Sequence, residues 1–210
     1  RIGSVAQVGG AYGLLLTDSK PAIDEATGKN ILRFTNNGRT AYNARSGKIE
    51  EIGSLTPDFL GSVSTGLRYK NLSMRVALDM RFGGYVASYN NRYGMAYGYT
   101  ETSLKYRDAE HGGVTWTSKF DGKTYSDGVI PDGIFASGTM ITQPNGSSVN
   151  VGGMTYADAM EAGYVEPSHA SGYHYFSNSW GQGTVSEDWV TELNYIALRE
   201  ISFGYNVPQT

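Results

Sequence analysis

The feature that most constrains this chain is an uninterrupted alternation of apolar and polar residues over residues 72–82. One side of the alternation is wholly apolar and consists of Leu72, Met74, Val76, Leu78, Met80 and Phe82. The other side consists of Ser73, Arg75, Ala77, Asp79 and Arg81. A period of two indicates a β-strand, because successive side chains of a strand point to opposite faces. The pattern therefore predicts a long strand with an uncharged apolar face and a polar face.

Two further segments share this period. Residues 61–69 also alternate, and only Lys70 and Asn71 separate them from the next strand, which predicts a long antiparallel hairpin over 61–83. Near the end of the chain, Ile201, Phe203 and Tyr205 share one face, and Pro208 ends the alternation because it lacks a backbone donor. We therefore expect transmembrane-length strands in 61–83 and 191–210.

The rest of the chain is rich in turn-forming residues. Glycine accounts for 28 and tyrosine for 16 of the 210 residues, a composition typical of turns and strands. We interpret 1–60 as a loop region with short hairpins and 84–190 as a long irregular loop region. Two short helices are expected in the second region, near 103–109 and near 156–162, where Thr155 and Asp158 form a weak capping box.

Composition excludes several classes of function. The net charge is −3, which argues against a nucleic-acid partner, since such a partner requires a basic surface. There is no cysteine, which excludes disulfides and thiol chemistry. No apolar run is long enough for a membrane-spanning helix, whereas a membrane-spanning strand needs only about 9–11 residues.

An alternating strand fits two architectures. In a soluble sandwich the apolar face points inward, and in an outer-membrane barrel it points toward lipid. The length of strand 72–82, the short turn opposite a long loop, and the aromatic residues near strand ends favour the barrel. In a barrel, Arg75, Asp79 and Arg81 would face a watery lumen, either as a structural charge network or as solute contacts. The lipid-facing set would comprise Leu72, Met74, Val76, Leu78, Met80, Phe82, Ile201, Phe203 and Tyr205.

Four short blocks of the sequence resemble motifs of a known family, and they occur along the chain in the same order as in the family. They are Pro57-Asp58-Phe59-Leu60-Gly61, then Tyr69-Lys70-Asn71-Leu72-Ser73, then Arg81-Phe82-Gly83-Gly84, and finally the long block from Tyr195 to Pro208. They are similar to the strand entry, hairpin turn, strand exit and Tyr-Ile-x-Leu-Arg-Glu-Val-Ser block of the SusC/RagA-like TonB-linked outer-membrane transporters of Gram-negative bacteria. Thr56 departs from the asparagine that the first block of the family carries.

The resemblance covers about 57–208 and implies a fragment from the C-terminal half of a large all-β barrel with antiparallel strands and long extracellular loops. A member of the family imports oligosaccharides or peptides with a SusD-like surface lipoprotein and draws energy through TonB. The plug domain, the TonB-contact segment and the last strand are not in this stretch, so we expect it to be part of a longer protein. The alternatives are a soluble secreted carbohydrate-binding β-sandwich and, more remotely, a β-rich glycan hydrolase.

The sequence contains no recognisable catalytic motif, and we predict that the chain is not an enzyme. It has no phosphate loop, zinc-protease motif or nucleophile elbow. His169 and His174 with Glu166 could ligate a metal, but their spacing fits no standard site, so no cofactor is predicted. Asp121, Asp127 and Asp132 each directly precede a glycine, which is a feature of calcium-binding loops. The ligand spacing of such a loop is missing. Repeated Asp-Gly more often marks turns.

Aromatic residues of 84–190 are the remaining candidates for ligand or partner contact. Tyr85, Tyr89, Tyr93 and Tyr97 recur every four residues and would line one face if the segment were helical. Such rings serve either loop packing or a stacking surface for sugars or for the partner lipoprotein. The candidates are Tyr89, Tyr93, Trp116, Tyr173, Tyr175 and Trp180.

Overall fold

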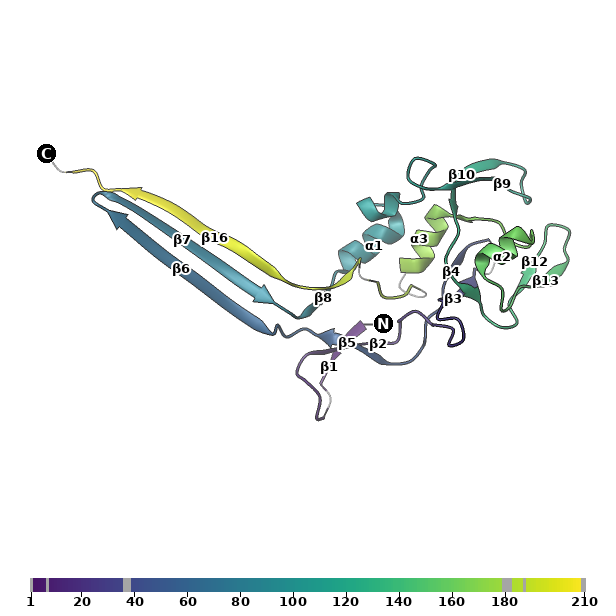
Figure 1. The fold of residues 1–210 in the computed structure, drawn as a ribbon, viewed down its shortest axis with the longest axis horizontal. Coiled ribbons are helices and arrows are strands. Elements are labelled where there is room, and N and C mark those ends of the chain that lie inside the picture. Colours follow the sequence, from purple (N-terminus) through teal and green to yellow (C-terminus); the bar gives the residue numbers. More distant parts are fainter. Residues whose placement is uncertain (1, 7, 36–38, 179–182, 187, 209–210) are drawn as a thin grey trace. The chain divides into compact units, whose positions relative to one another are not determined.

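The chain divides into two compact units (Figure 1). The computed structural model describes residues 2–6, 8–35, 39–178, 183–186 and 188–208. Unit 1 consists of Arg1–Ile2, Thr17–Glu50 and Ser88–Trp189, and unit 2 of Gly3–Leu16, Glu51–Ala87 and Val190–Thr210. Strands account for 42% and helices for 14% of the structure, so the fold is β-rich with mainly antiparallel sheets rather than purely β. The described strands form small sheets and no closed barrel.

A sheet of three long antiparallel strands dominates unit 2. Its order is β16 (Tyr195–Tyr205), β7 (Leu72–Phe82) and β6 (Phe59–Tyr69). β6 and β7 pair without a break from Phe59 opposite Phe82 to Tyr69 opposite Leu72. Lys70 adopts a φ of 53° in the two-residue turn, the positive φ that tight hairpins use. The predicted hairpin and the predicted third strand are therefore confirmed as secondary structure.

Shorter strands complete unit 2. One sheet contains β1 (Ile2–Val5), β2 (Leu14–Thr17) and β5 (Glu50–Ser54). β8 (Tyr85–Ala87) pairs with β15 (Val190–Glu192), which extends the pairing of β7 with β16 beyond the long sheet. A side chain at Gly53 would collide with the ring of Tyr85, because a Cβ there would lie 2.4 Å from a ring carbon.

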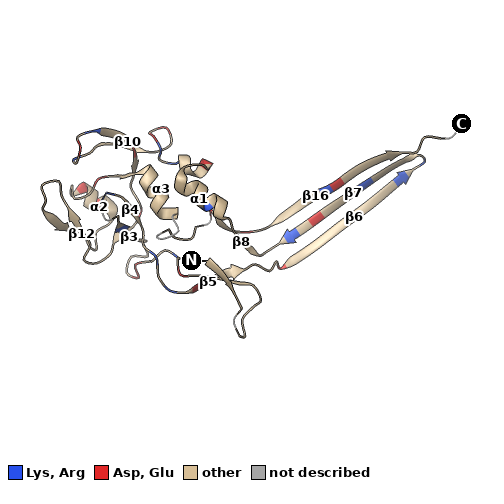
Figure 2. Cartoon of the chain, turned by 180° about the vertical axis from the view of Figure 1, so that it is seen from behind, with Lys and Arg blue, Asp and Glu red and all other residues tan. Residues whose placement is uncertain are grey.

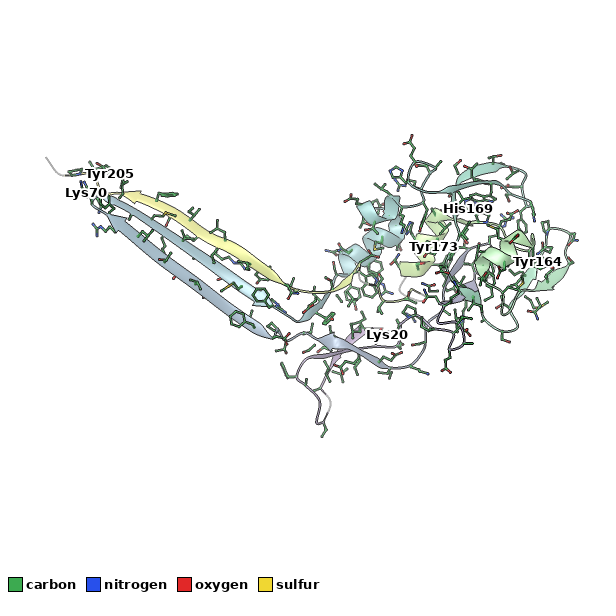
Figure 3. All side chains as sticks on the ribbon, viewed as in Figure 1. Lys20, Lys70, Tyr164, His169, Tyr173 and Tyr205 are labelled. Carbon is green, nitrogen blue, oxygen red and sulfur yellow. The ribbon has the colours of Figure 1, made fainter. Side chains whose placement is uncertain are left out.

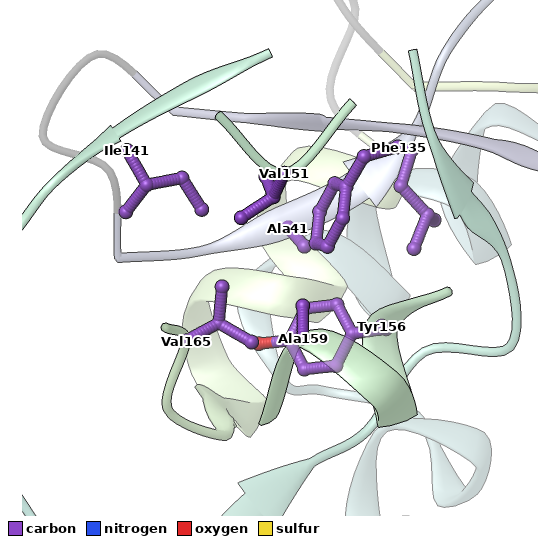
Figure 4. Packing of buried hydrophobic residues seen from close by; sticks show 8 residues of the cluster. Ala41, Phe135, Ile141, Val151, Tyr156, Ala159 and Val165 are labelled. Atoms are coloured by element: carbon purple, nitrogen blue, oxygen red, sulfur yellow. The ribbon is translucent and has the colours of Figure 1, made fainter. Parts of the chain in front are cut away.

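Unit 1 is built around a buried apolar core that draws on five short strands and a helix. The strands are β3 (Ile31–Phe34), β4 (Ala41–Asn43), β11 (Ile134–Phe135), β12 (Met140–Thr142) and β13 (Ser148–Asn150), and the helix is α2 (Tyr156–Glu161). β11 runs parallel to β3, and β4 runs antiparallel to it. The core cluster (Figure 4) consists of Leu32, Ala41, Phe135, Ile141, Val151, Tyr156, Ala159 and Val165.

Two packed helices and a second small sheet form the rest of unit 1. The helices are α1 (Tyr89–Tyr97) and α3 (Ala170–Asn178), and the 3-10 helix η1 (Glu101–Leu104) follows α1. The sheet contains β9 (Val114–Thr117), β10 (Thr124–Val129) and β14 (Ser168–His169). The Ser88 hydroxyl accepts the Asn91 N–H at the start of α1, and Gly98 ends the helix with a φ of 84°.

The helix predictions were partly right. Helix α2 lies where one was expected, and the Thr155 hydroxyl accepts the Asp158 N–H at its start, as the weak capping box predicted. The predicted helix near 103–109 is wrong, because η1 ends at Leu104 and turns follow it. Helices α1 and α3 were not predicted.

Candidate functional site

The most distinctive surface of unit 2 is the apolar face of its long sheet. Directly paired residues of antiparallel strands point to the same face, so the register shows which side chains share it. The face carries no charged residue, and at each end it carries aromatic rings. We call it the apolar face; it consists of Phe59, Val63, Leu67, Tyr69, Leu72, Met74, Val76, Leu78, Met80, Phe82, Ile196, Leu198, Ile201, Phe203 and Tyr205.

All nine residues predicted to be lipid-facing belong to this apolar face. Several are widely exposed: Phe203 retains 75% of its accessible surface and Tyr205 retains 60%. Leu67 of β6 and Ile196 of β16, which were not on the predicted set, are exposed to a similar extent. Contact of this face with lipid remains a prediction.

A β-bulge at Arg199 keeps β16 apolar on one face along its whole length. Leu198 pairs with Leu78, whereas Glu200 pairs with Ala77, so Arg199 is the extra residue. The bulge changes the phase of the alternation, and even-numbered Leu198 and odd-numbered Ile201 thereby share the apolar face. The sequence carried a signal for it, since two polar residues in succession interrupt the alternation at Arg199-Glu200.

The opposite face of the sheet carries paired charges. Figure 2 colours the charged residues on the ribbons of β7 and β16, the two strands that these pairs join. Asp79 accepts a hydrogen bond from Arg199 Nε at 2.8 Å, and Arg75 Nε lies 3.7 Å from a Glu200 carboxylate oxygen. Both pairs join β7 to β16. The predicted residues Arg75, Asp79 and Arg81 thus share the polar face, where Arg199 and Glu200 are partners that the sequence analysis did not single out.

Arg81 differs from the other two because it binds backbone. Its Nη2 donates to the Leu55 carbonyl oxygen at 3.1 Å, and its Nε donates to that of Gly83 at 3.4 Å. These contacts fix the entry to β6 relative to the exit from β7. Arg75 and Asp79 thus take part in ion pairs between strands, whereas Arg81 binds backbone carbonyl oxygens.

The two ends of the long sheet are different. At one end, Lys70 of the turn and Tyr205 lie close together in Figure 3, and Lys70 Nζ lies 5.4 Å from the Tyr69 ring centroid. At the other end, the Phe59 and Phe82 rings lie 6.2 Å apart. Residues 83–194 connect β7 to β16 at this second end, opposite the two-residue turn.

Three of the four tyrosines of the four-residue repeat share one face of a helix, as expected for a helical segment. Tyr85 lies in strand β8 of unit 2, whereas Tyr89, Tyr93 and Tyr97 lie on helix α1 of unit 1. The Tyr89 ring packs 6.3 Å from the Trp189 ring, and Tyr93 is partly exposed. Beside them the buried Arg92 places its guanidinium 4.6 Å from the Trp189 ring centroid, and burial lowers its pKa.

Trp116, Tyr173 and Tyr175, the remaining aromatic candidates within the described residues, lie in unit 1. The Trp116 ring lies 5.3 Å from Tyr125 and 5.1 Å from His169, so it belongs to a packed cluster. Tyr173 packs edge-on against Tyr106 at 6.4 Å, and burial raises its pKa. The position of Tyr173 is labelled in Figure 3. Tyr175 is exposed and lines a cavity, and Trp180 lies outside the described residues.

The residues considered for a metal site separate in the structure. His169 Nδ1 lies 3.2 Å from both carboxylate oxygens of Asp127. His174 Nε2 donates to the Lys105 carbonyl oxygen at 2.8 Å, and Glu166 accepts from the Ser118 hydroxyl at 3.0 Å and from the Lys119 N–H. In the described part of the chain, no group of three or more His, Cys, Asp and Glu residues could hold a metal ion.

The three aspartates considered for calcium also have separate partners. Asp121 accepts from the Tyr125 hydroxyl at 2.7 Å, and this hydrogen bond lowers the pKa of Asp121 and raises that of Tyr125. Asp127 pairs with His169, and Asp132 lies 2.7 Å from Lys29 Nζ. Asp127-Gly128 lies within strand β10, so the expectation that the Asp-Gly pairs mark turns is wrong for this pair.

Compared with models of known protein families and with curated proteins, the chain matches none. None of the helices within the described ranges is long and apolar enough to cross a membrane.

Proposed function

We propose that residues 1–210 are part of a SusC-like, TonB-dependent transporter in the outer membrane of a Gram-negative bacterium. The observation that carries the proposal is the long sheet of unit 2, in which three strands of 11 residues combine an uncharged apolar face with a charged opposite face. A barrel strand that crosses a membrane needs about 9–11 residues. The block resemblance to the SusC/RagA-like family adds the transporter class.

The distribution of charge supports lipid contact. A lipid-exposed Arg or Lys at the bilayer midplane costs about 2–4 kcal/mol, so a lipid-facing surface excludes charge, whereas a water-filled lumen tolerates it. The apolar face has no charged residue, and the face behind it has two ion pairs. Aromatic rings at both ends of the sheet suit the interfacial girdles of a barrel.

The rest of the barrel would come from other parts of a longer protein. β6 and β16 are the edge strands of the long sheet, and an open edge is not stable in hydrocarbon because its backbone groups lack partners. In a barrel, both β6 and β16 would therefore be hydrogen-bonded to neighbouring strands. The plug domain and the segment that contacts TonB would also lie outside these 210 residues.

The lengths of the connections support an assignment of each end of the sheet to one side of the membrane. Outer-membrane barrels have short periplasmic turns and long extracellular loops. Lys70 and Asn71 would then form a periplasmic turn, and 83–194 would reach the extracellular side. Unit 1 would meet a SusD-like lipoprotein there, and the imported solute would be an oligosaccharide or a peptide. The role of the chain is transport rather than catalysis.

Spin labels on β16 test the proposal. The 210 residues contain no cysteine, so single-cysteine variants of the full-length protein can be labelled after reconstitution into lipid vesicles. Labels at Ile196→Cys, Leu198→Cys, Ile201→Cys and Phe203→Cys should be accessible to oxygen, which concentrates in lipid. Labels at the matched controls Ala197→Cys and Ser202→Cys should be accessible to a water-soluble nickel chelate.

The bulge makes the expected pattern specific. Oxygen accessibility should change from even to odd positions across Arg199, which a regular strand would not do. Low accessibility to both reagents at all four apolar positions would mean that they form an inner protein core. That result would refute the barrel and leave the soluble carbohydrate-binding sandwich.

A further inference from the structure

Unit 1 contains a cavity that none of the preceding assignments uses. Its volume is about 340 Å³, and it lies where the C-terminal end of α1 meets the first turns of α3. Small-ligand pockets have volumes of about 300–1,000 Å³, so the cavity is large enough for one or two sugar rings. Its polar and aromatic lining includes Tyr97, Arg107, Asp127, Ser171, His174 and Tyr175.

Two tyrosine rings form an aromatic wall of the cavity. The ring centroids of Tyr97 and Tyr175 lie 5.9 Å apart with an edge-to-face angle of 65°. Tyr97 is 60% exposed and Tyr175 is 40% exposed, so parts of both rings are open to solvent. An exposed ring face is a platform for the apolar C–H face of a sugar, since it offers a flat contact area with little loss of rotamer freedom.

The polar lining offers donors and acceptors in balance. Arg107 provides guanidinium donors, and its hydrogen bond to the Gly98 carbonyl oxygen is long at 3.4 Å. Asp127 provides carboxylate acceptors next to His169. The buried His174 uses Nε2 to donate to the Lys105 carbonyl oxygen, and in that tautomer its Nδ1 is an acceptor.

The formal charges of the cavity lining balance. The lining carries the Arg107 guanidinium and the Asp127 carboxylate, and Asp127 pairs with His169. A charged solute would be attracted by one of these two groups and repelled by the other, so the lining favours neither sign of charge. A neutral ring with several hydroxyl groups can accept from Arg107 and donate to Asp127 while its apolar face covers a tyrosine.

We infer that this cavity binds one or two residues of a neutral saccharide, with a sugar ring packed on Tyr97 or Tyr175 and hydroxyl groups bonded to Arg107 and Asp127. The inference rests on the proposed function in one respect, because it takes the bound saccharide to be the solute that is imported. Binding itself does not depend on the barrel.

The test is a glycan array with neutral and acidic oligosaccharides, probed with the full-length protein, followed by calorimetry with the neutral oligosaccharide that binds best. Tyr97→Ala, Tyr175→Ala and Arg107→Met should each weaken its binding about tenfold or more. Tyr99→Ala is the matched control, because Tyr99 is 87% exposed and does not line the cavity. It should bind like the unmodified protein.

Several outcomes would overturn the inference. They are the absence of any neutral glycan among the bound probes, a preference for acidic glycans, and neutral-glycan binding that survives all three cavity substitutions. A thermal melt of each variant shows that unit 1 is still folded. The spin-label pattern on β16 reports on the barrel independently, so saccharide binding without lipid contact would refute the proposed function while supporting the cavity.

Discussion

The two units differ in the exposure of their apolar residues, which are buried in the core of unit 1 and exposed on the long sheet of unit 2. In unit 1, Leu32 and Tyr156 are fully buried, and the core is complete within the unit. In unit 2, Phe203 retains 75% and Leu67 64% of their accessible surface on a face without charge. Unit 1 therefore buries its apolar core within itself, whereas the apolar face of unit 2 is not covered by the rest of that unit.

Substitution of one phenylalanine in each unit, Phe135 and Phe203, tests this difference in burial through the free energy of unfolding. Phe135 is buried in unit 1, where its ring lies 5.0 Å from Phe34 and 5.5 Å from Tyr156. Phe135→Ala should lower the free energy of unfolding of unit 1 by about 3–5 kcal/mol, because it leaves a cavity in the core. Denaturant unfolding followed by tryptophan fluorescence measures this loss.

Phe203→Ala is the matched control on the apolar face. It should change the same unfolding free energy by less than about 0.5 kcal/mol, as is usual for an exposed side chain. If both substitutions had equal effects on the unfolding of unit 1, the division of the chain into two separately stabilised units would be wrong.

A charge introduced on the apolar face tests whether lipid covers that face. Leu78 pairs with Val63 on one side and Leu198 on the other, near the middle of the sheet. If lipid covers this face, Leu78→Arg should reduce the stability of the inserted full-length protein by about 2–4 kcal/mol. Unfolding of the protein in vesicles by denaturant measures the effect.

The neighbouring Ala77→Arg controls for the added side chain. Ala77 lies on the opposite face and pairs with Glu200, so a new arginine there meets an acidic residue and, in the proposed barrel, the aqueous lumen. It should be tolerated. Equal loss from Ala77→Arg and Leu78→Arg would contradict the assignment of one face to lipid and the other to water.

The buried hydroxyl of Tyr156 makes one contribution to the pH dependence of unit 1. The Tyr156 hydroxyl donates to the Glu166 carbonyl oxygen at 2.6 Å, and burial raises the pKa of Tyr156 from 10.0 to about 12. Both the folded and unfolded states keep this proton below pH 10. Between pH 10 and about pH 12 the unfolded state loses it first, so stability falls by about 2–3 kcal/mol, at 1.36 kcal/mol per pKa unit.

Tyr156→Phe isolates that contribution. The variant should start less stable at neutral pH, because the hydrogen bond is missing, and its stability should fall less steeply between pH 10 and pH 12. Urea unfolding of both proteins across this range gives the difference in slope. Parallel pH profiles for the two proteins would show that another group causes the loss.

The sequence predicted the long strands of unit 2 because their pattern is local. In β7, six apolar positions alternate with polar ones, so the face of each residue can be read without knowledge of its partners. The short helix α2 was predictable for the same reason, since Thr155 and Asp158 form its cap. The β-bulge at Arg199 also has a local signal, because two successive polar residues, Arg199 and Glu200, shift the apolar–polar alternation by one position. The sequence analysis did not predict the bulge.

Unit 1 was not predictable because its order depends on contacts between distant segments. Leu32, Phe135 and Tyr156 meet in the core from strands of two to four residues and a helix of six, too short to show a period. Helix α1 contains Asn90, Asn91 and Gly94, which favour helix weakly, and it relies on packing against α3. The cavity between these two helices was hidden for the same reason.

The smallest expected effect concerns the charge pair between β7 and β16. Asp79 and Arg199 lie 2.8 Å apart, but both side chains are about half exposed, and an ion pair in water contributes at most about 1 kcal/mol. A double-mutant cycle with Asp79→Ala and Arg199→Ala should therefore give a coupling below about 1 kcal/mol, measured by denaturant unfolding in vesicles. A coupling of several kcal/mol would mean that the pair is shielded from water. The polar face would then be a buried interface, and the contrast between a lipid-covered face and a water-covered face of one sheet would fail.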